Sequence, residues 1–110
     1  MTKRHTKDWA AIESTDLTGA NRRLTVTGEV ETFVSNEKAT LREAVPQGTN
    51  PKILILDLSV AADGIGAEVL GWTTATFTRA ISLHQYDQVT IRTDDADVTI
   101  DVEEIHSLTA

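Results

Sequence analysis

The chain contains no cysteine, few aromatic residues and no long hydrophobic run. The lack of cysteine excludes disulfides, thiolate catalysis and cysteine-ligated zinc or iron–sulfur centres. No apolar stretch approaches the roughly 18 residues that cross a membrane. Residues 1–7 are basic, but no apolar segment of the kind found in secretory signals follows them. We therefore expect a cytoplasmic protein that does not bind membranes.

Positive charge is also scarce, and it is unevenly distributed. The formal net charge is −7. Residues 1–55 carry eight Lys/Arg against seven Asp/Glu, whereas residues 56–110 carry two against ten. Because binding to the phosphate backbone needs clustered Lys and Arg, we expect no nucleic-acid partner. The acidic second half is typical of solvated strand faces; the alternative is a charge-complementary contact between subunits.

Threonine is abundant, with 17 residues, and alternation of apolar and polar positions is frequent. Both features favour β-strands, since threonine is β-branched and a half-buried strand repeats every second residue. Glycine inside such a strand, as at position 28, indicates a bulge or a close approach of another backbone. Strands are expected near residues 8–14, 24–31, 39–45, 52–60, 68–83, 88–92 and 98–103.

About seven antiparallel strands at spacings of roughly ten residues predict an all-β fold, an immunoglobulin-like β-sandwich. We expect a flexible basic N-terminus over residues 1–7 and a single β-sandwich domain over residues 8–110. The segment 68–83 is the ambiguous one, because it also has a helical stripe. Its four threonines between 73 and 78, with Gly71 in the run, favour the strand.

The strand 52–60 has two apolar faces, which is unusual for an antiparallel strand with one face in water. Leu54, Leu56 and Leu58 share one face, while Ile53 and Ile55 lie on the other. Either another part of the chain covers the second face, or that face forms a subunit contact. Ile53 and Ile55 are therefore candidate self-association residues, and a homodimer is the expected assembly.

Three stretches resemble a group of short, uncharacterised bacterial β-sandwich proteins. They are residues 24–28 (LTVTG), residues 46–51 (PQGTNP) leading into 53–58, and residues 86–91 (YDQVTI). The resemblance covers about residues 24–106, and the Pro-Gln-Gly-x-Asn-Pro stretch carries most of it. It implies the β-sandwich fold and no particular activity.

Candidate chemistry is sparse. A metal site, or the cleft of a small metal- or ligand-dependent enzyme, would draw on His84, Asp87 and His106 if the strand ends converge. The carboxylates of the 94–104 hairpin lack calcium-loop spacing, and whether they bind a cation is left open. Trp9 and Trp72 are expected to anchor the core. The sequence identifies no catalytic residue and no cofactor. The leading hypothesis is a non-enzymatic binding or structural module that self-associates, or that binds another protein.

Overall fold

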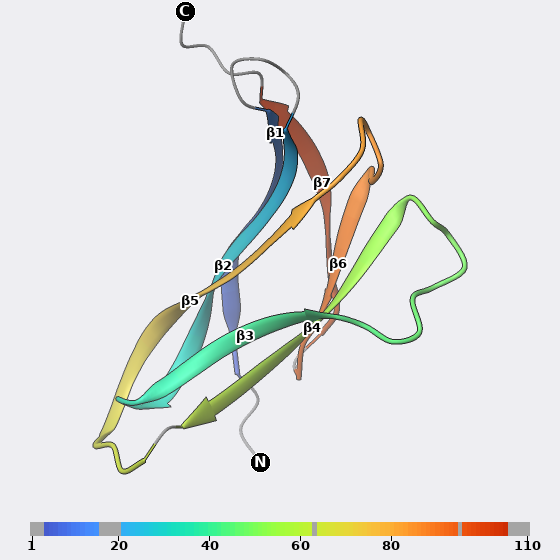
Figure 1. Ribbon diagram of the computed structural model, residues 1–110. Coiled ribbons are helices and arrows are strands. Elements are labelled where there is room, and N and C mark those ends of the chain that lie inside the picture. The colour runs from blue at the N-terminus through green and yellow to red at the C-terminus, as the bar shows by residue number, and fades with distance from the viewer. Residues whose placement is uncertain (1–3, 16–20, 63, 95, 106–110) are drawn as a thin grey trace, which may run out of the picture.

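The computed structural model describes residues 4–15, 21–62, 64–94 and 96–105. These residues form seven strands and no helix (Figure 1). The strands are β1 (Thr6–Thr15), β2 (Arg22–Val34), β3 (Glu37–Glu43), β4 (Ile53–Ala62), β5 (Glu68–Ala80), β6 (Gln88–Arg92) and β7 (Val98–Ile105). The all-β class and the strand count predicted from the sequence are confirmed. The ambiguous segment is a strand, as its threonines indicated.

The strands form one mixed sheet in the order β3-β4-β6-β7-β1-β2-β5. Four of the pairings are antiparallel, while β1 pairs with β7 and β4 pairs with β6 in parallel. The sheet curls until its two end strands, β3 and β5, come into contact (Figure 1). The result is a barrel-like shape that is nearly closed.

The immunoglobulin-like sandwich is not confirmed. A sandwich has two separate antiparallel sheets, whereas here one continuous set of pairings runs through all seven strands. Alternation along a strand predicts which of its side chains face inward, but it does not predict which strand pairs with that strand. The two parallel pairings could therefore not be predicted from the alternation. The predicted C-terminal hairpin is present, with Ile91 opposite Val98.

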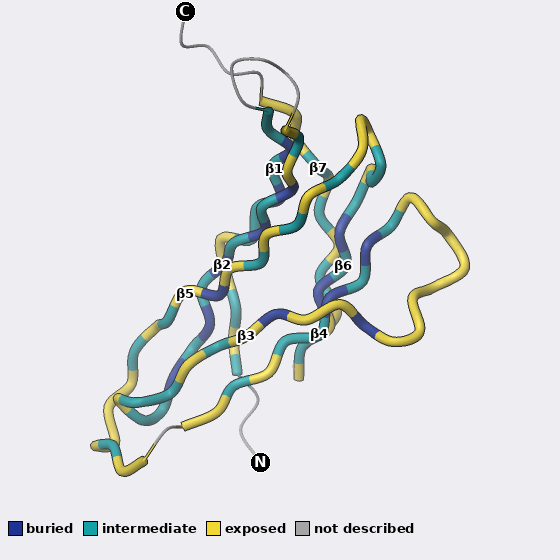
Figure 2. The backbone as a smooth tube through the Cα atoms, viewed as in Figure 1, coloured by how far each residue is buried: buried dark blue, intermediate teal, exposed yellow. Residues whose placement is uncertain are grey.

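The core lies between the facing halves of the curled sheet, and the middles of β2, β4 and β6 contribute most to it (Figure 2). Alternation accounts for this placement, because residues two apart on a strand share a face. The fully buried large apolar side chains are Leu24, Val26, Val30, Leu54, Leu56, Val89 and Ile91.

Gly28 lies at an inward-facing position of β2, and the Trp9 ring fills the space that a side chain at position 28 would occupy. Asp8 and Trp9 of β1 together lie opposite Gly28, since Lys7 pairs with Glu29 and Ala10 pairs with Thr27. This is a β-bulge, and Asp8 takes the left-handed conformation (φ 57°). A Cβ on Gly28 would lie 2.2 Å from the Trp9 ring. A bulge therefore lies opposite Gly28, and the group that approaches the glycine is a side chain, not the backbone expected from the sequence.

The N-terminal boundary differs from the prediction. β1 begins at Thr6, which pairs with Val30, so the strand extends into the segment predicted as a basic N-terminus. Arg4 is also held, by a bond to the backbone oxygen of Glu31 and by an ion pair with Glu37. Residues 1–3 and 106–110, which lie in the predicted terminus and at the end of the predicted domain, are outside the described residues.

Candidate functional site

A buried carboxylate lies near the end of β1. Glu13 has the same parity as Trp9 and Ala11, so it points inward, and its side chain is only 1 % exposed. A buried charge needs a partner. Arg22, directly after the β1–β2 connection, supplies it through Nη1 at 2.5 Å from Glu13 Oε2. The same oxygen accepts the backbone N–H of His84 at 3.2 Å.

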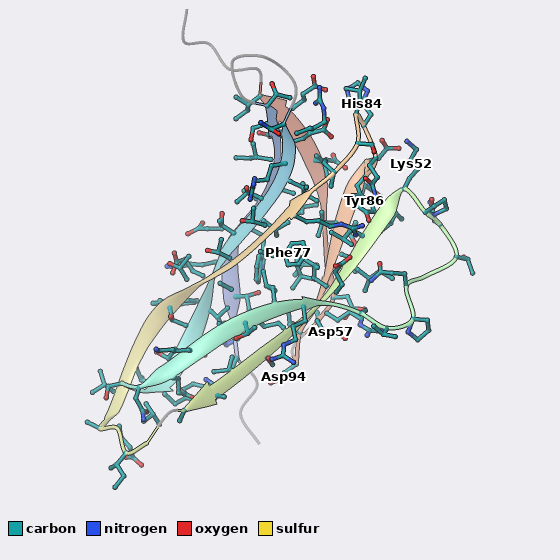
Figure 3. All side chains as sticks on the ribbon, viewed as in Figure 1. Lys52, Asp57, Phe77, His84, Tyr86 and Asp94 are labelled. Atoms are coloured by element: carbon teal, nitrogen blue, oxygen red, sulfur yellow. The ribbon has the colours of Figure 1, made fainter. Side chains whose placement is uncertain are left out.

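His84 and Glu104 complete a cluster around this carboxylate. His84 lies in the connection between β5 and β6, at the far end of the molecule from Asp57 and Asp94 (Figure 3). Its backbone is in the left-handed region (φ 49°), and its Nε2 contacts Oε2 of Glu104 on β7. Donor atoms of Glu13, His84 and Glu104 all lie within 4.8 Å of one another. Both His84 and Glu104 are open to solvent, whereas Glu13 is buried.

The predicted set of His84, Asp87 and His106 is only partly assembled. Asp87 is not in the cluster of described residues that contains His84. Its backbone instead joins Lys52 and Val102. His106 lies outside the described residues. The sequence reasoning missed Glu13, although a signal was present, because a glutamate in phase with Trp9 and Ala11 has to point inward.

The predicted self-association residues Ile53 and Ile55 are half-buried within the chain itself. Gln47 holds the β3–β4 connection onto the backbone of Ile55, donating from Nε2 to its O (2.9 Å) and accepting its N–H at Oε1 (2.8 Å). Gly48 lies against the Ile55 side chain. The β3–β4 connection therefore covers part of this face, at Ile55, and self-association through the rest of it stays a prediction.

Apolar side chains are instead exposed at the start of β5 and in the loop before it. We call Ile65, Val69, Leu70 and Trp72 the β5 patch. Val69 and Leu70 are neighbours on the strand and point to opposite faces, yet they are 52 % and 77 % exposed. A hollow of about 410 Å³ lies between this end of β5 and Phe33 and Val34 of β2.

The two tryptophans differ. Trp9 is half-buried against the core and donates its indole N–H to Thr6 Oγ1 at 2.9 Å. Trp72 is 45 % exposed, and the Lys7 ammonium lies 4.2 Å from its ring centroid. Trp9 therefore anchors the core as expected. The same expectation for Trp72 is wrong, because its position on β5 faces solvent.

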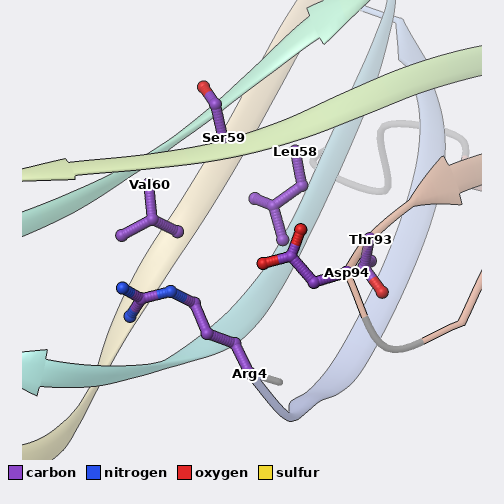
Figure 4. Close-up of a pocket in the computed structure, with 6 residues that line it drawn as sticks. All are labelled: Arg4, Leu58, Ser59, Val60, Thr93 and Asp94. Carbon is purple, nitrogen blue, oxygen red and sulfur yellow. The ribbon is translucent and has the colours of Figure 1, made fainter. Parts of the chain in front are cut away.

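A second hollow, of about 360 Å³, lies beside β4 and is lined by Arg4, Val60 and Asp94 among others (Figure 4). Arg4 is already engaged within the chain, because its guanidinium binds both carboxylate oxygens of Glu37. Glu37 also accepts the backbone N–H groups of Phe33 and Val34. The Arg4 bond, supported by these N–H groups, lowers the pKa of Glu37 to about 2. This charge therefore fixes the corner between β2 and β3.

The carboxylates of the C-terminal hairpin are dispersed. Asp94 lines the hollow beside Arg4, and Asp101 accepts a hydrogen bond from Gln88. Asp95 lies outside the described residues. On the neighbouring strands, Asp57 of β4 forms a two-bond ion pair with Arg92 of β6, which lowers the pKa of Asp57. These contacts are structural links between strands.

Comparisons with protein-family models, with curated proteins and with solved structures find no match to the chain. The resemblance of residues 24–106 to short bacterial β-sandwich proteins therefore stays a prediction. Within the described ranges there is no helix long and apolar enough to pass through a membrane.

Proposed function

We propose that the protein is a non-enzymatic binding module that self-associates through the β5 patch. The observation that carries the proposal is the exposure of Val69 and Leu70, which lie side by side on one strand and are open on both faces of the sheet. Exposed apolar clusters of this kind are typical of interaction surfaces. Ile65, in the preceding loop, extends the patch and is fully exposed.

The position of β5 in the sheet supports strand pairing as the mode of contact. β5 is an end strand: β2 is its one ladder partner among the described residues, and β3 contacts it without pairing. End strands offer backbone groups that another strand can pair with. Pairing of the same strand from two copies gives a two-fold dimer, the commonest form of homo-oligomer.

The sequence of β5 fits a second copy as the partner. With the two-fold axis at Gly71, antiparallel pairing sets Leu70 opposite Trp72 of the other copy, and Val69 opposite Thr73. Glu68 falls opposite Thr74, so no like charges face each other directly over residues 68–74. Aromatic and aliphatic pairs across strands each contribute about 0.2–1 kcal/mol.

The predicted contact through Ile53 and Ile55 is the competing interface. Both side chains are half-buried, and the β3–β4 connection contacts Ile55, so their apolar surface is less available than that of the β5 patch. Both interfaces predict a dimer, and they differ in which substitution disrupts it.

Sedimentation equilibrium over low to high micromolar concentrations tests the proposal. We expect the wild type to dimerise, and Leu70→Glu to weaken dimerisation at least tenfold by placing a charge opposite Trp72 of the partner. Leu83→Glu is the matched control, because Leu83 is 62 % exposed but lies outside the patch. A monomeric wild type at high micromolar concentration would overturn the proposal. If Ile53→Ser dissociates the dimer and Leu70→Glu does not, the interface is formed by β4 instead of the β5 patch.

A further inference from the structure

The cluster of Glu13, His84 and Glu104 has the composition and spacing of a metal site. Its donors come from β1, from the β5–β6 connection and from β7, which are distant in the sequence and converge at one end of the barrel. The geometry points to a site for one first-row divalent transition ion of the Zn²⁺ class, bound by one imidazole nitrogen and two carboxylate oxygens.

The spacing is close to what such an ion needs. Zn²⁺ binds imidazole nitrogen and carboxylate oxygen at roughly 2.0–2.2 Å, so tetrahedral ligand atoms lie about 3.4 Å apart. The three donor atoms lie within 4.8 Å of one another. Glu104 and His84 are exposed, so side-chain rotation can supply the small closing movement. Glu13 is buried and fixed by two hydrogen bonds, which makes it the preorganised ligand.

The donor set favours a transition ion over Ca²⁺ or Mg²⁺. Calcium and magnesium prefer sites made entirely of oxygen ligands, whereas imidazole suits zinc, copper, iron and nickel. His84 Nε2 and Glu104 Oε2 already face each other. An ion bound between these two atoms would replace their direct contact.

Arg22 is the competing positive charge, since it is bound to Glu13 Oε2. An ionised carboxylate has about four lone-pair positions on two oxygens, so one guanidinium bond and one backbone N–H do not exhaust it.

Three protein ligands leave a fourth position, which a water molecule or a side chain would fill. The inference concerns binding and does not depend on self-association through the β5 patch, which includes none of these residues. A bound ion would link β1, β7 and the β5–β6 connection, and would therefore stabilise the folded chain.

Isothermal titration with Zn²⁺, with Ca²⁺ as the comparison ion, tests the site on the full chain. We expect one Zn²⁺ per chain, and at least a tenfold loss of affinity in His84→Gln and in Glu104→Gln. Glu103→Gln is the matched control, because Glu103 is the exposed neighbour of Glu104 on β7 and lies outside the cluster. His5→Gln controls for zinc bound by a histidine elsewhere. Neither control should change the affinity.

Thermal unfolding gives a second, independent readout of zinc binding to the folded chain. At a free Zn²⁺ concentration of 100 Kd, we expect the Tm of the wild type to rise by about 10 °C. The rise should be lost in His84→Gln, although this variant should fold, since His84 is exposed. The site is refuted if the wild type binds zinc no better than His84→Gln, if Glu103→Gln loses as much affinity as Glu104→Gln, or if Ca²⁺ binds more tightly than Zn²⁺.

Discussion

The strands β4 and β5 both carry several large apolar side chains, but the two strands bury them to different extents. In β4, Leu54 and Leu56 are completely buried, Ile53 and Ile55 are half-buried, and the β3–β4 connection contacts Ile55. In β5, Ala75 is buried, whereas Val69 and Leu70 are open to solvent. The comparison teaches that apolar composition alone does not mark an interaction surface. What distinguishes the strands is whether the chain supplies a cover.

The same truncation in the two strands should have the largest and most different effects. Leu56→Ala leaves a cavity in the core and should lower the free energy of unfolding by about 2–5 kcal/mol. Leu70→Ala removes an exposed side chain and should cost less than about 0.5 kcal/mol. Urea denaturation of both variants below the dimerisation range checks this. A loss of 2 kcal/mol or more in Leu70→Ala would show that the β5 patch is packed within one chain.

The glycines of the neighbouring strands β2 and β5 offer a second matched pair. Gly28→Ala drives a methyl group into the Trp9 ring, at 2.2 Å, and should cost at least about 1–3 kcal/mol. Gly71→Ala meets only Thr32 Oγ1 at 3.4 Å, an ordinary contact, so its stability should change little. Thermal unfolding with tryptophan fluorescence measures both, and the Trp9 environment should change only in the first variant. Equal destabilisation of the two variants would contradict this packing.

The bulge at Gly28 also shows how far the sequence was informative. Period-two patterns located the strands, and Gly28 inside the pattern at residues 24–31 predicted a bulge or a close approach of another backbone. The structure has a bulge on the neighbouring strand and a side chain against the glycine. The identity of its neighbour was beyond reach, because the Asp8–Trp9 bulge arises from pairing between two strands. The parallel pairings of β1 with β7 and of β4 with β6 were hidden for the same reason.

The candidate metal site was half predictable. His84 was identified as one of only three imidazoles, and it does lie in a cluster of possible ligands. Asp87 was included on the condition that the strand ends converge, but the fold joins His84 to β1 and β7. Glu13 could have been found from its parity with Trp9. Glu104 could not have been found from the sequence, because its approach to His84 depends on the parallel pairing of β7 with β1.

Polar contacts rather than apolar burial hold the corner beside the open end of β5. Ser35, between β2 and β3, forms hydrogen bonds with the backbone of Ala67. Glu37, at the start of β3, holds the same corner through its ion pair with Arg4. Glu37→Gln removes the charge from a side chain that is 7 % exposed, and should cost about 1–3 kcal/mol at neutral pH. Urea denaturation from pH 7 down to pH 2 measures this.

The difference in the free energy of unfolding between the wild type and Glu37→Gln should depend on pH with a definite sign. The pKa of Glu37 falls from 4.5 to about 2 on folding, so its ionised form stabilises the native state above about pH 4.5. This contribution is lost as the pH falls towards 2. The wild type and Glu37→Gln should therefore differ fully at pH 7 and converge towards pH 2. A difference that stays constant over this range would mean that the Arg4 pair does not contribute through its charge.

The smallest expected effect comes from loosening the β3–β4 connection over β4, which would expose apolar side chains there as they are exposed on β5. Gln47→Ala removes the two bonds to the Ile55 backbone and a third to the oxygen of Ala44, and should cost about 1 kcal/mol because the site is exposed. Gln85→Ala, which removes one local bond to Ser82, is the control. With its cover loosened, the Ile53 and Ile55 face should bind a hydrophobic dye and promote association that Leu70→Glu does not prevent. If Gln47→Ala changes neither dye binding nor association, covering by the loop is not what separates β4 from β5.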